Sequence, residues 1–202
     1  MKLVLASASP RRRALLDEAG LAFDVGEDDV DERVVAGEMP EAYVRRLALE
    51  KARAGLAQHP ASVVLGADTT VVIDGEILGK PVDDADAHRM LEQLSGRSHQ
   101  VLTGVAIAWR EGGRVAIDRT TVWFKALSPS DIAQYVATGE PRDKAGAYAI
   151  QGLASRFIER IDGSYSNVVG LPVAVVLQLL ADVGVTPTRP PAASSSDSSG
   201  FG

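Results

Sequence analysis

Apolar residues recur along most of the chain with two spacings, one typical of helices and the other of strands. Ala87, Met90, Leu91 and Leu94 fall at i, i+3, i+4 and i+7, which predicts an amphipathic helix that begins at the Asp83-Asp84 pair and ends at Gly96. Proline near the start and, in most cases, glycine at the end delimit the other predicted helices, at 9–20, 40–53, 128–139 and 172–184.

Strands are expected between these helices, at 3–6, 63–73, 100–109, 114–124 and 155–161. Residues 101–108 are apolar on both faces, as in a covered central strand. The Arg-Glu-Gly-Gly-Arg stretch at 110–114 is typical of a hairpin loop. Hairpin-linked strands together with helix-separated strands predict an α/β fold, with a mixed central β-sheet flanked by helices.

Composition changes once along the chain, near its end. Residues 186–202 are rich in Pro, Ser, Ala and Gly and have no apolar periodicity, which predicts a disordered C-terminal tail. No linker or internal repeat interrupts residues 1–185, so we expect one folded domain there.

Charge and composition exclude several classes of protein. The chain has no cysteine, which removes disulfides, thiolate nucleophiles and cysteine metal sites. A net charge of −6 argues against a broad nucleic-acid surface, but a small phosphorylated ligand needs only a local cluster of donors. No apolar stretch is long enough for a membrane span or a secretory signal, so we expect a cytoplasmic protein without membrane or nucleic-acid partners.

The densest basic cluster lies in the opening segment Ser7-Ala-Ser-Pro-Arg-Arg-Arg13. Small residues follow a predicted strand and precede a predicted helix, whose first N–H groups lack intrahelical partners. Serine hydroxyls and guanidinium groups at that point suit a phosphate. The alternative is an ordinary Ser-Pro N-cap with solvated arginines, and the local motif leaves both open.

Two lysines and an aspartate are further candidates. Lys51 falls within the apolar arc of its helix. Its ammonium could reach the edge of a pocket, or its aliphatic stem could simply pass core residues on the way to solvent. Asp68 interrupts an apolar strand and needs a partner such as a divalent cation or an activated water, unless backbone amides at the strand end hold it. Lys80 precedes a proline, which favours an extended backbone.

Glu32 and Gln151 complete the set of candidates. Glu32 belongs to the acidic stretch at 27–32, and one of these carboxylates could reach a cation beside Asp68, since Mg²⁺ needs only one or two protein carboxylates. Gln151 can offer a donor and an acceptor to a base edge, although an ordinary loop would look the same. The three histidines lack metal-ligand spacing, and we expect no catalytic role for them.

Eight short motifs occur in one order and resemble the Maf (septum formation inhibitor) family over about residues 2 to 184. They are Ser7-x-Ser-Pro-Arg-Arg12, Glu50-Lys-Ala-Arg53, Gly66-Ala-Asp-Thr69, Leu78-Gly-Lys-Pro81, Ser95-Gly-x-x-His-x-Val101, Asp143-Lys-Ala-Gly-Ala-Tyr148, Ile150-Gln-Gly152 and Asn167-Val-Val-Gly-Leu-Pro172. A small departure is Ala149, where glycine is frequent in the family.

The resemblance implies a single catalytic domain of the ITPase-like (Maf/Ham1) fold that cuts nucleoside triphosphates between the α- and β-phosphates. The family's dTTP/UTP subgroup carries Arg, Thr and Gln at three positions, which here are Arg11, Thr69 and Gln151. A sister subgroup, active on 7-methyl-GTP, tends to have an aromatic residue, Gln and Glu there. The resemblance therefore implies a dTTP/UTP pyrophosphatase, with a 7-methyl-GTP pyrophosphatase and a non-enzymatic septation regulator as alternatives.

Roles for individual residues also follow from the resemblance. Asp68 is expected to accept a proton from water, and Glu32 and Asp68 to hold a divalent cation, Mg²⁺ or Mn²⁺. Lys51 and Lys80 are expected to offset charge on the leaving pyrophosphate. The residues expected to bind the substrate are Ser7, Arg11, Arg12, Thr69 and Gln151. A homodimer is left open.

Overall fold

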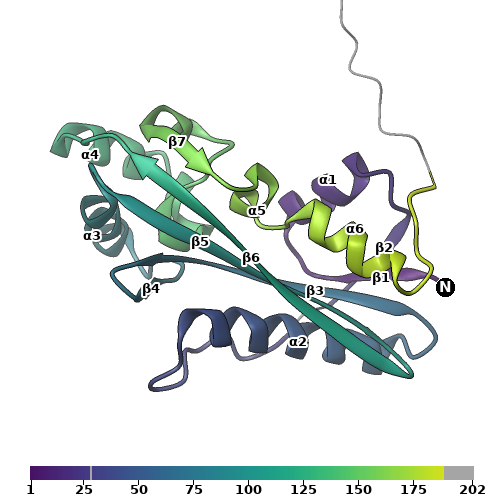
Figure 1. Ribbon diagram of the computed structural model, residues 1–202. Coiled ribbons are helices and arrows are strands. Elements are labelled where there is room, and N and C mark those ends of the chain that lie inside the picture. Colours follow the sequence, from purple (N-terminus) through teal and green to yellow (C-terminus); the bar gives the residue numbers. More distant parts are fainter. Residues whose placement is uncertain (28, 189–202) are drawn as a thin grey trace, which may run out of the picture.

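Seven strands form one mixed sheet in the computed structural model, which describes residues 1–27 and 29–188 (Figure 1). The strands are β1 (Leu3–Ala6), β2 (Phe23–Gly26), β3 (Val63–Ile73), β4 (Glu76–Leu78), β5 (Ser98–Trp109), β6 (Gly112–Phe124) and β7 (Ile158–Asp162). Their order is β2-β1-β3-β5-β6-β7, and β4 pairs separately with β3. Strand β1 runs parallel to β2 and β3, and every later pairing is antiparallel. The expected mixed sheet is therefore confirmed.

Helices cover both faces of this sheet, as expected. They are α1 (Pro10–Glu18), α2 (Pro40–Gln58), α3 (Asp84–Leu94), α4 (Pro129–Ala137), α5 (Tyr165–Val169) and α6 (Val173–Ala181), with 3₁₀ turns at Glu140–Asp143, Ala145–Ala147 and Leu153–Phe157. Helix α2 lies along one face, below the long strands in Figure 1, whereas α1, α5 and α6 lie on the other face and α3 and α4 at the far end.

The five predicted helices are confirmed, and side-chain caps mark the starts of three of them, whereas α2 and α6 have no such cap. Ser9 caps α1 through its hydroxyl and is followed by a proline, and Ser128 forms a capping box with Asp131 at the start of α4. Helix α2 runs five residues beyond its expected end at Arg53. Helix α5 was not predicted, because its five residues are too few for a periodic apolar pattern.

The strands differ from expectation mainly at their ends. Strand β5 begins two residues earlier than predicted, and Gly112 already pairs with Trp109, so the β5–β6 loop is a two-residue turn. Residues 155–157 form part of a 3₁₀ turn instead of a strand. The short strands β2 and β4 were missed, since four and three residues carry little alternation.

Helix α2 packs against the sheet closely enough for backbone to meet backbone. A Cβ atom at Gly66 of β3 would lie 2.4 Å from the Ala48 carbonyl oxygen, and one at Gly104 of β5 would lie 2.2 Å from the Val44 carbonyl oxygen. Only glycine leaves room for these contacts. The position of α2 relative to β3 is therefore fixed along its length.

One edge of β3 opens where its neighbours stop. Strand β1 pairs with β3 as far as Gly66, and β4 pairs with it only from Val71 onward. Over the described residues, positions 67–70 of β3 thus have β5 as their only strand partner. Successive side chains of a strand point to opposite faces, so Asp68 and Thr69 reach this gap from both sides of the sheet.

The end of the described chain lies against the N-terminal half of the fold. The Thr188 amide donates a hydrogen bond to the Gly20 carbonyl at 3.0 Å. Of the tail predicted for residues 186–202, residues 189–202 lie outside the described part of the chain. Across those that are described, no helix combines the length and apolar character needed to cross a membrane.

Candidate functional site

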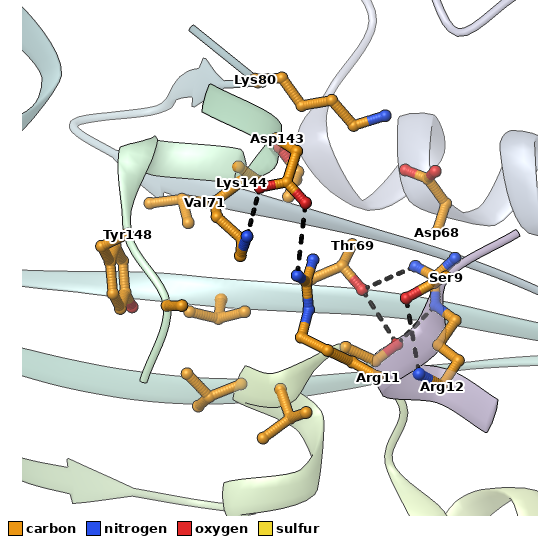
Figure 2. A pocket seen from close by; sticks show the side chains of 18 of the residues that line it. Ser9, Arg11, Arg12, Asp68, Thr69, Val71, Lys80, Asp143, Lys144 and Tyr148 are labelled. Carbon is orange, nitrogen blue, oxygen red and sulfur yellow. Dashed lines mark hydrogen bonds and ion pairs between the residues drawn. The ribbon is translucent and has the colours of Figure 1, made fainter. Parts of the chain in front are cut away.

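A cavity of about 710 Å³ occupies the gap beside β3 (Figure 2). Its walls come from the segment after β1, from α1 and α2, from the loop before α2, from the 3₁₀ turns after α4 and from the end of α5. All nine candidates line it: Ser7, Arg11, Arg12, Glu32, Lys51, Asp68, Thr69, Lys80 and Gln151. The structure therefore brings the predicted site residues together, while their roles remain predictions.

Lys51 is the centre of the charged part of the cavity. Its ammonium lies 2.6 Å from Glu32 Oε1 and 2.8 Å from Asp68 Oδ1, and its side chain is only 3% exposed. The sequence predicted that Lys51 points from an apolar arc, and the residue's burial confirms this. A buried carboxylate needs a charged or hydrogen-bonding partner, and for Asp68 that partner is the Lys51 ammonium.

The two carboxylates differ in protonation behaviour. Burial raises the pKa of Asp68, and the charge of Lys51 opposes this shift without cancelling it. Burial also acts to raise the pKa of Glu32, but Lys51 and Lys80 outweigh it and the pKa is lowered. Asp68 therefore has the greater proton affinity of the two, as suits a group that accepts a proton from water.

Lys80 is a second lysine near the carboxylates of Glu32 and Asp68. Its ammonium lies 3.3 Å from Glu32 Oε2, and the side chain points toward Asp68 across the cavity (Figure 2). The charged lining residues are Arg11, Arg12, Lys51, Lys80, Arg142, Lys144, Glu32, Asp68 and Asp143. Positive charges thus exceed negative ones by three, in a chain of net charge −6, and an anionic ligand is favoured here.

Arg12 joins three parts of the chain at the base of the cavity. Its Nε donates to the Gly170 carbonyl at 2.9 Å, Nη1 to Ser7 Oγ at 3.2 Å and Nη2 to Thr69 Oγ1 at 3.2 Å. Thr69 Oγ1 also donates to the Gly170 carbonyl. This arginine therefore holds the cavity wall together as well as adding positive charge to it.

The neighbouring arginines behave differently. Arg11 lies 3.6 Å from Asp143 across the cavity, and Asp143 also pairs with Lys144 (Figure 2). Arg13 turns back to the Ala8 carbonyl and is not among the lining residues. Ser9 Oγ accepts from the Arg12 amide, so the opening segment is at once an N-cap and a cavity wall.

The end of the cavity away from Asp68 includes an aromatic and an aliphatic side chain. Tyr148 and Val71 lie there (Figure 2), and the exposed Gln151 also lines the cavity. The Tyr148 hydroxyl lies 2.8 Å from His99 Nε2, and burial lowers the pKa of His99 to about 3. His99 is thus a neutral residue of the core.

Glu32 and Asp68 suit a divalent cation in part. Hard carboxylate oxygens are appropriate ligands for Mg²⁺ or Mn²⁺, and Mg²⁺ takes few protein ligands beside phosphate oxygens. Within the described residues, no group of three or more His, Cys, Asp or Glu side chains could form a complete metal cage. The two carboxylates therefore fit an ion that a phosphorylated ligand also binds.

Sequence reasoning missed some lining residues. Tyr43 lines the cavity, and its hydroxyl donates to the Glu32 carbonyl at 2.9 Å. Its place near Lys51 on the helical wheel was the available signal, but the position of the Glu32 loop was not readable from sequence. Asp143 and Lys144 belong to one of the eight motifs, but only the fold places Asp143 beside Arg11.

The cavity is cationic, lies at the open edge of a mixed sheet and contains a buried Asp–Lys pair. These features are those of an α/β protein whose cavity suits an anionic ligand. The chain belongs to the Maf family: the model of the Maf-like protein family matches residues 2–183. A dTTP/UTP pyrophosphatase of Symbiobacterium thermophilum is 54% identical, with 91% of this chain and 94% of that protein covered. Another, of Shewanella oneidensis, is 53% identical, with 92% and 100% covered.

Solved structures are similar at a lower level. Protein VC0702 of Vibrio cholerae is 14% identical with a TM-score of 0.47, over 91% of this chain and 95% of that one. The Ham1 protein of Staphylococcus aureus is 15% identical with a TM-score of 0.44, over 61% and 72%.

Proposed function

We propose that this protein is a nucleoside triphosphate pyrophosphatase that hydrolyses dTTP and UTP to the nucleoside monophosphate and pyrophosphate. The observation that carries the proposal is the Glu32–Lys51–Asp68 arrangement inside a cavity with excess positive charge. Membership of the Maf family, and relatives named dTTP/UTP pyrophosphatase at 53–54% identity, support the same reaction.

In the proposed mechanism Asp68 accepts the proton of the attacking water. The raised pKa of its carboxylate supports this role, because a stronger base is a better proton acceptor. Lys51 keeps Asp68 oriented through its 2.8 Å contact and adds positive charge beside it. Lys80 and Arg12 offset negative charge on the triphosphate and on the leaving pyrophosphate.

Glu32 and Asp68 would hold Mg²⁺ or Mn²⁺ shared with the triphosphate. When bound, such an ion supplies Lewis-acid polarisation of the phosphoryl group and neutralises developing charge. The protein's own contribution would be the carboxylates of Glu32 and Asp68, both of which also contact the Lys51 ammonium.

Base selection is assigned to the other end of the cavity. Gln151 is exposed on the wall and offers both a donor and an acceptor to a pyrimidine edge. Arg11, which also lines the cavity, lies 3.6 Å from Asp143. Thr69 Oγ1 lies within hydrogen-bond distance of Arg12, Thr103 and Gly170, so it acts in this proposal mainly by fixing Arg12.

The test is pyrophosphate release by the purified chain with Mg²⁺ and a panel of nucleoside triphosphates. We expect turnover of dTTP and UTP, and for Asp68→Asn a loss of at least about two to three orders of magnitude in kcat. Circular dichroism of the variant checks that it is folded. Near-normal dTTP hydrolysis by Asp68→Asn would refute the role of Asp68.

The same panel distinguishes the alternatives. Preferential hydrolysis of 7-methyl-GTP would place the chain in the sister subgroup, and absence of any pyrophosphate would favour a nucleotide-binding regulator of septation. A cytoplasmic location belongs to the same proposal. A homodimer stays a prediction for measurement of the mass in solution.

A further inference from the structure

The segment that carries Glu32 into the cavity has neither helix nor strand. Residues 29–39 precede α2 without regular hydrogen bonding, yet the Glu32 carboxylate lies 2.6 Å from the buried Lys51 ammonium. A metal-binding carboxylate on such a segment needs other contacts to keep its place, because a free loop would spend much of its time elsewhere. Helix α2 supplies those contacts.

Tyr43 makes the first contact. Its ring belongs to a core cluster with Val44, Leu47 and Leu102, and the residue is 8% exposed. From that position the hydroxyl donates a 2.9 Å hydrogen bond to the Glu32 carbonyl. The main chain of Glu32 is therefore tied to a side chain that is itself immobilised by packing.

Arg46 makes the second contact, one turn further along α2. Its Nη2 donates to the Arg33 carbonyl at 3.1 Å, the next carbonyl after that of Glu32. Both oxygens of Glu38 also accept from this guanidinium, at 2.7 and 2.8 Å. Glu50 holds it from the helix side at 3.3 Å. The fork of Arg46 thus binds the segment at two places.

We propose that Tyr43 and Arg46 are positioning residues, which hold the main chain of the Glu32 segment on α2 and so place the Glu32 carboxylate beside Asp68 for a divalent cation. Lys51 belongs to the same helix, so α2 carries both the ammonium and the two anchors of the carboxylate. Because α2 meets the sheet backbone to backbone at Gly66, this arrangement is fixed relative to Asp68. The inference rests on the proposed function.

The experiment compares Tyr43→Phe with the wild-type protein. The variant keeps the ring in its cluster and removes only the hydroxyl. We expect the Mg²⁺ concentration for half-maximal dTTP hydrolysis to rise about tenfold, as for other outer-shell partners of metal ligands. Binding of Mn²⁺ in the presence of a non-hydrolysable α,β-imido analogue of dTTP, followed by electron paramagnetic resonance, should weaken to the same extent. Arg46→Lys should act in the same direction.

A double-mutant cycle separates positioning from a general loss of stability. If Tyr43 acts through Glu32, then Tyr43→Phe added to Glu32→Gln should weaken Mn²⁺ binding no further. Tyr135→Phe is the matched control, since it removes another hydroxyl from a buried ring that does not itself line the cavity; that hydroxyl donates to Glu140 and accepts from the Ala149 amide, and it makes no contact with Glu32. It should change the Tm without changing the dependence on Mg²⁺.

Two results would overturn the inference. One is a Tyr43→Phe protein that binds Mn²⁺ and the analogue as the wild type does, and the other is a full additive loss in the double variant. Failure of the proposed function looks different, because the wild-type protein itself would then release no pyrophosphate from dTTP.

Discussion

The ammonium of Lys51 lies 2.8 Å from the Asp68 carboxylate, although the two residues come from a helix and a strand on different layers of the fold. Both side chains are almost fully buried. A buried charge is tolerated only when it is paired, so each residue makes the other's position possible. The contact links the packing of α2 directly to the chemistry of the cavity.

Replacing Lys51 with Met should change the pH dependence of turnover. Asp68 must be ionised to accept a proton, so kcat/KM rises as the pH rises through the pKa of Asp68. Burial raises that pKa above its ordinary value and Lys51 restrains it, so the wild-type acid limb should lie above about pH 3.9. In the Lys51→Met variant the acid limb should move to still higher pH. Identical limbs in the pH–rate profiles of the two proteins would exclude Asp68 as the titrating base.

His99 should make the fold sensitive to acid. Its pKa is lowered by burial to about 3, below the unfolded value, so between pH 6.5 and 3 the unfolded chain binds a proton that the folded protein does not. The stability present above pH 6.5 is therefore lost as the pH falls, by up to about 1.4 kcal/mol per unit from this residue. His99→Phe should be less stable at pH 7, because Tyr148 loses its partner, and should show a shallower decline. Urea denaturation at pH 7, 6 and 5 measures both, and parallel declines would contradict the assignment.

Gly104→Ala should destabilise the protein strongly. The added Cβ would lie 2.2 Å from the Val44 carbonyl oxygen, and backbone atoms can move away only if α2 shifts as a whole. We expect a loss of about 3 kcal/mol, with a lower Tm in calorimetry. Gly79→Ala is the control, because no atom lies within 4 Å of a Cβ at that position. A Gly104→Ala protein as stable as this control would mean that α2 does not pack as described.

Gln151→Glu should alter substrate choice without unfolding the protein. The side chain is exposed on the cavity wall, so the change costs little stability. It removes an amide donor and adds a negative charge where the proposal places the base. Loss of one hydrogen bond of about 1 kcal/mol corresponds to roughly a fivefold fall in kcat/KM for dTTP and UTP. Steady-state kinetics on both nucleotides measures this, and unchanged values would remove Gln151 from base selection.

Much of the fold could be predicted because its signals are local. Ser9-Pro10, Pro40 and Ser128-Pro129 mark helix starts that need no tertiary information, and the two-sided apolar pattern of β5 already indicated a central strand. Strands β2 and β4 and helix α5 escaped prediction for the opposite reason. Each is too short for a periodic pattern, and pairing or packing with distant segments stabilises it.

The candidate site could be predicted as a set of residues but not as an arrangement. The helical wheel showed that Lys51 points inward, and an apolar context showed that Asp68 needs a partner. That each is the other's partner depends on α2 lying against β3, which no spacing in the sequence encodes. The same holds for Tyr43, whose hydroxyl meets a carbonyl supplied by an irregular segment.

The contacts of Arg12 determine when one wall of the cavity can form during synthesis of the chain. Its guanidinium joins Ser7 and Thr69 to the carbonyl of Gly170, 158 residues further along the chain. A nascent chain on the ribosome cannot form this wall of the cavity until Gly170 has emerged, when nearly all of the described fold has been synthesised. A product terminated before that residue would lack the acceptor that Gly170 supplies to both Arg12 and Thr69, so this wall of the cavity would be incomplete.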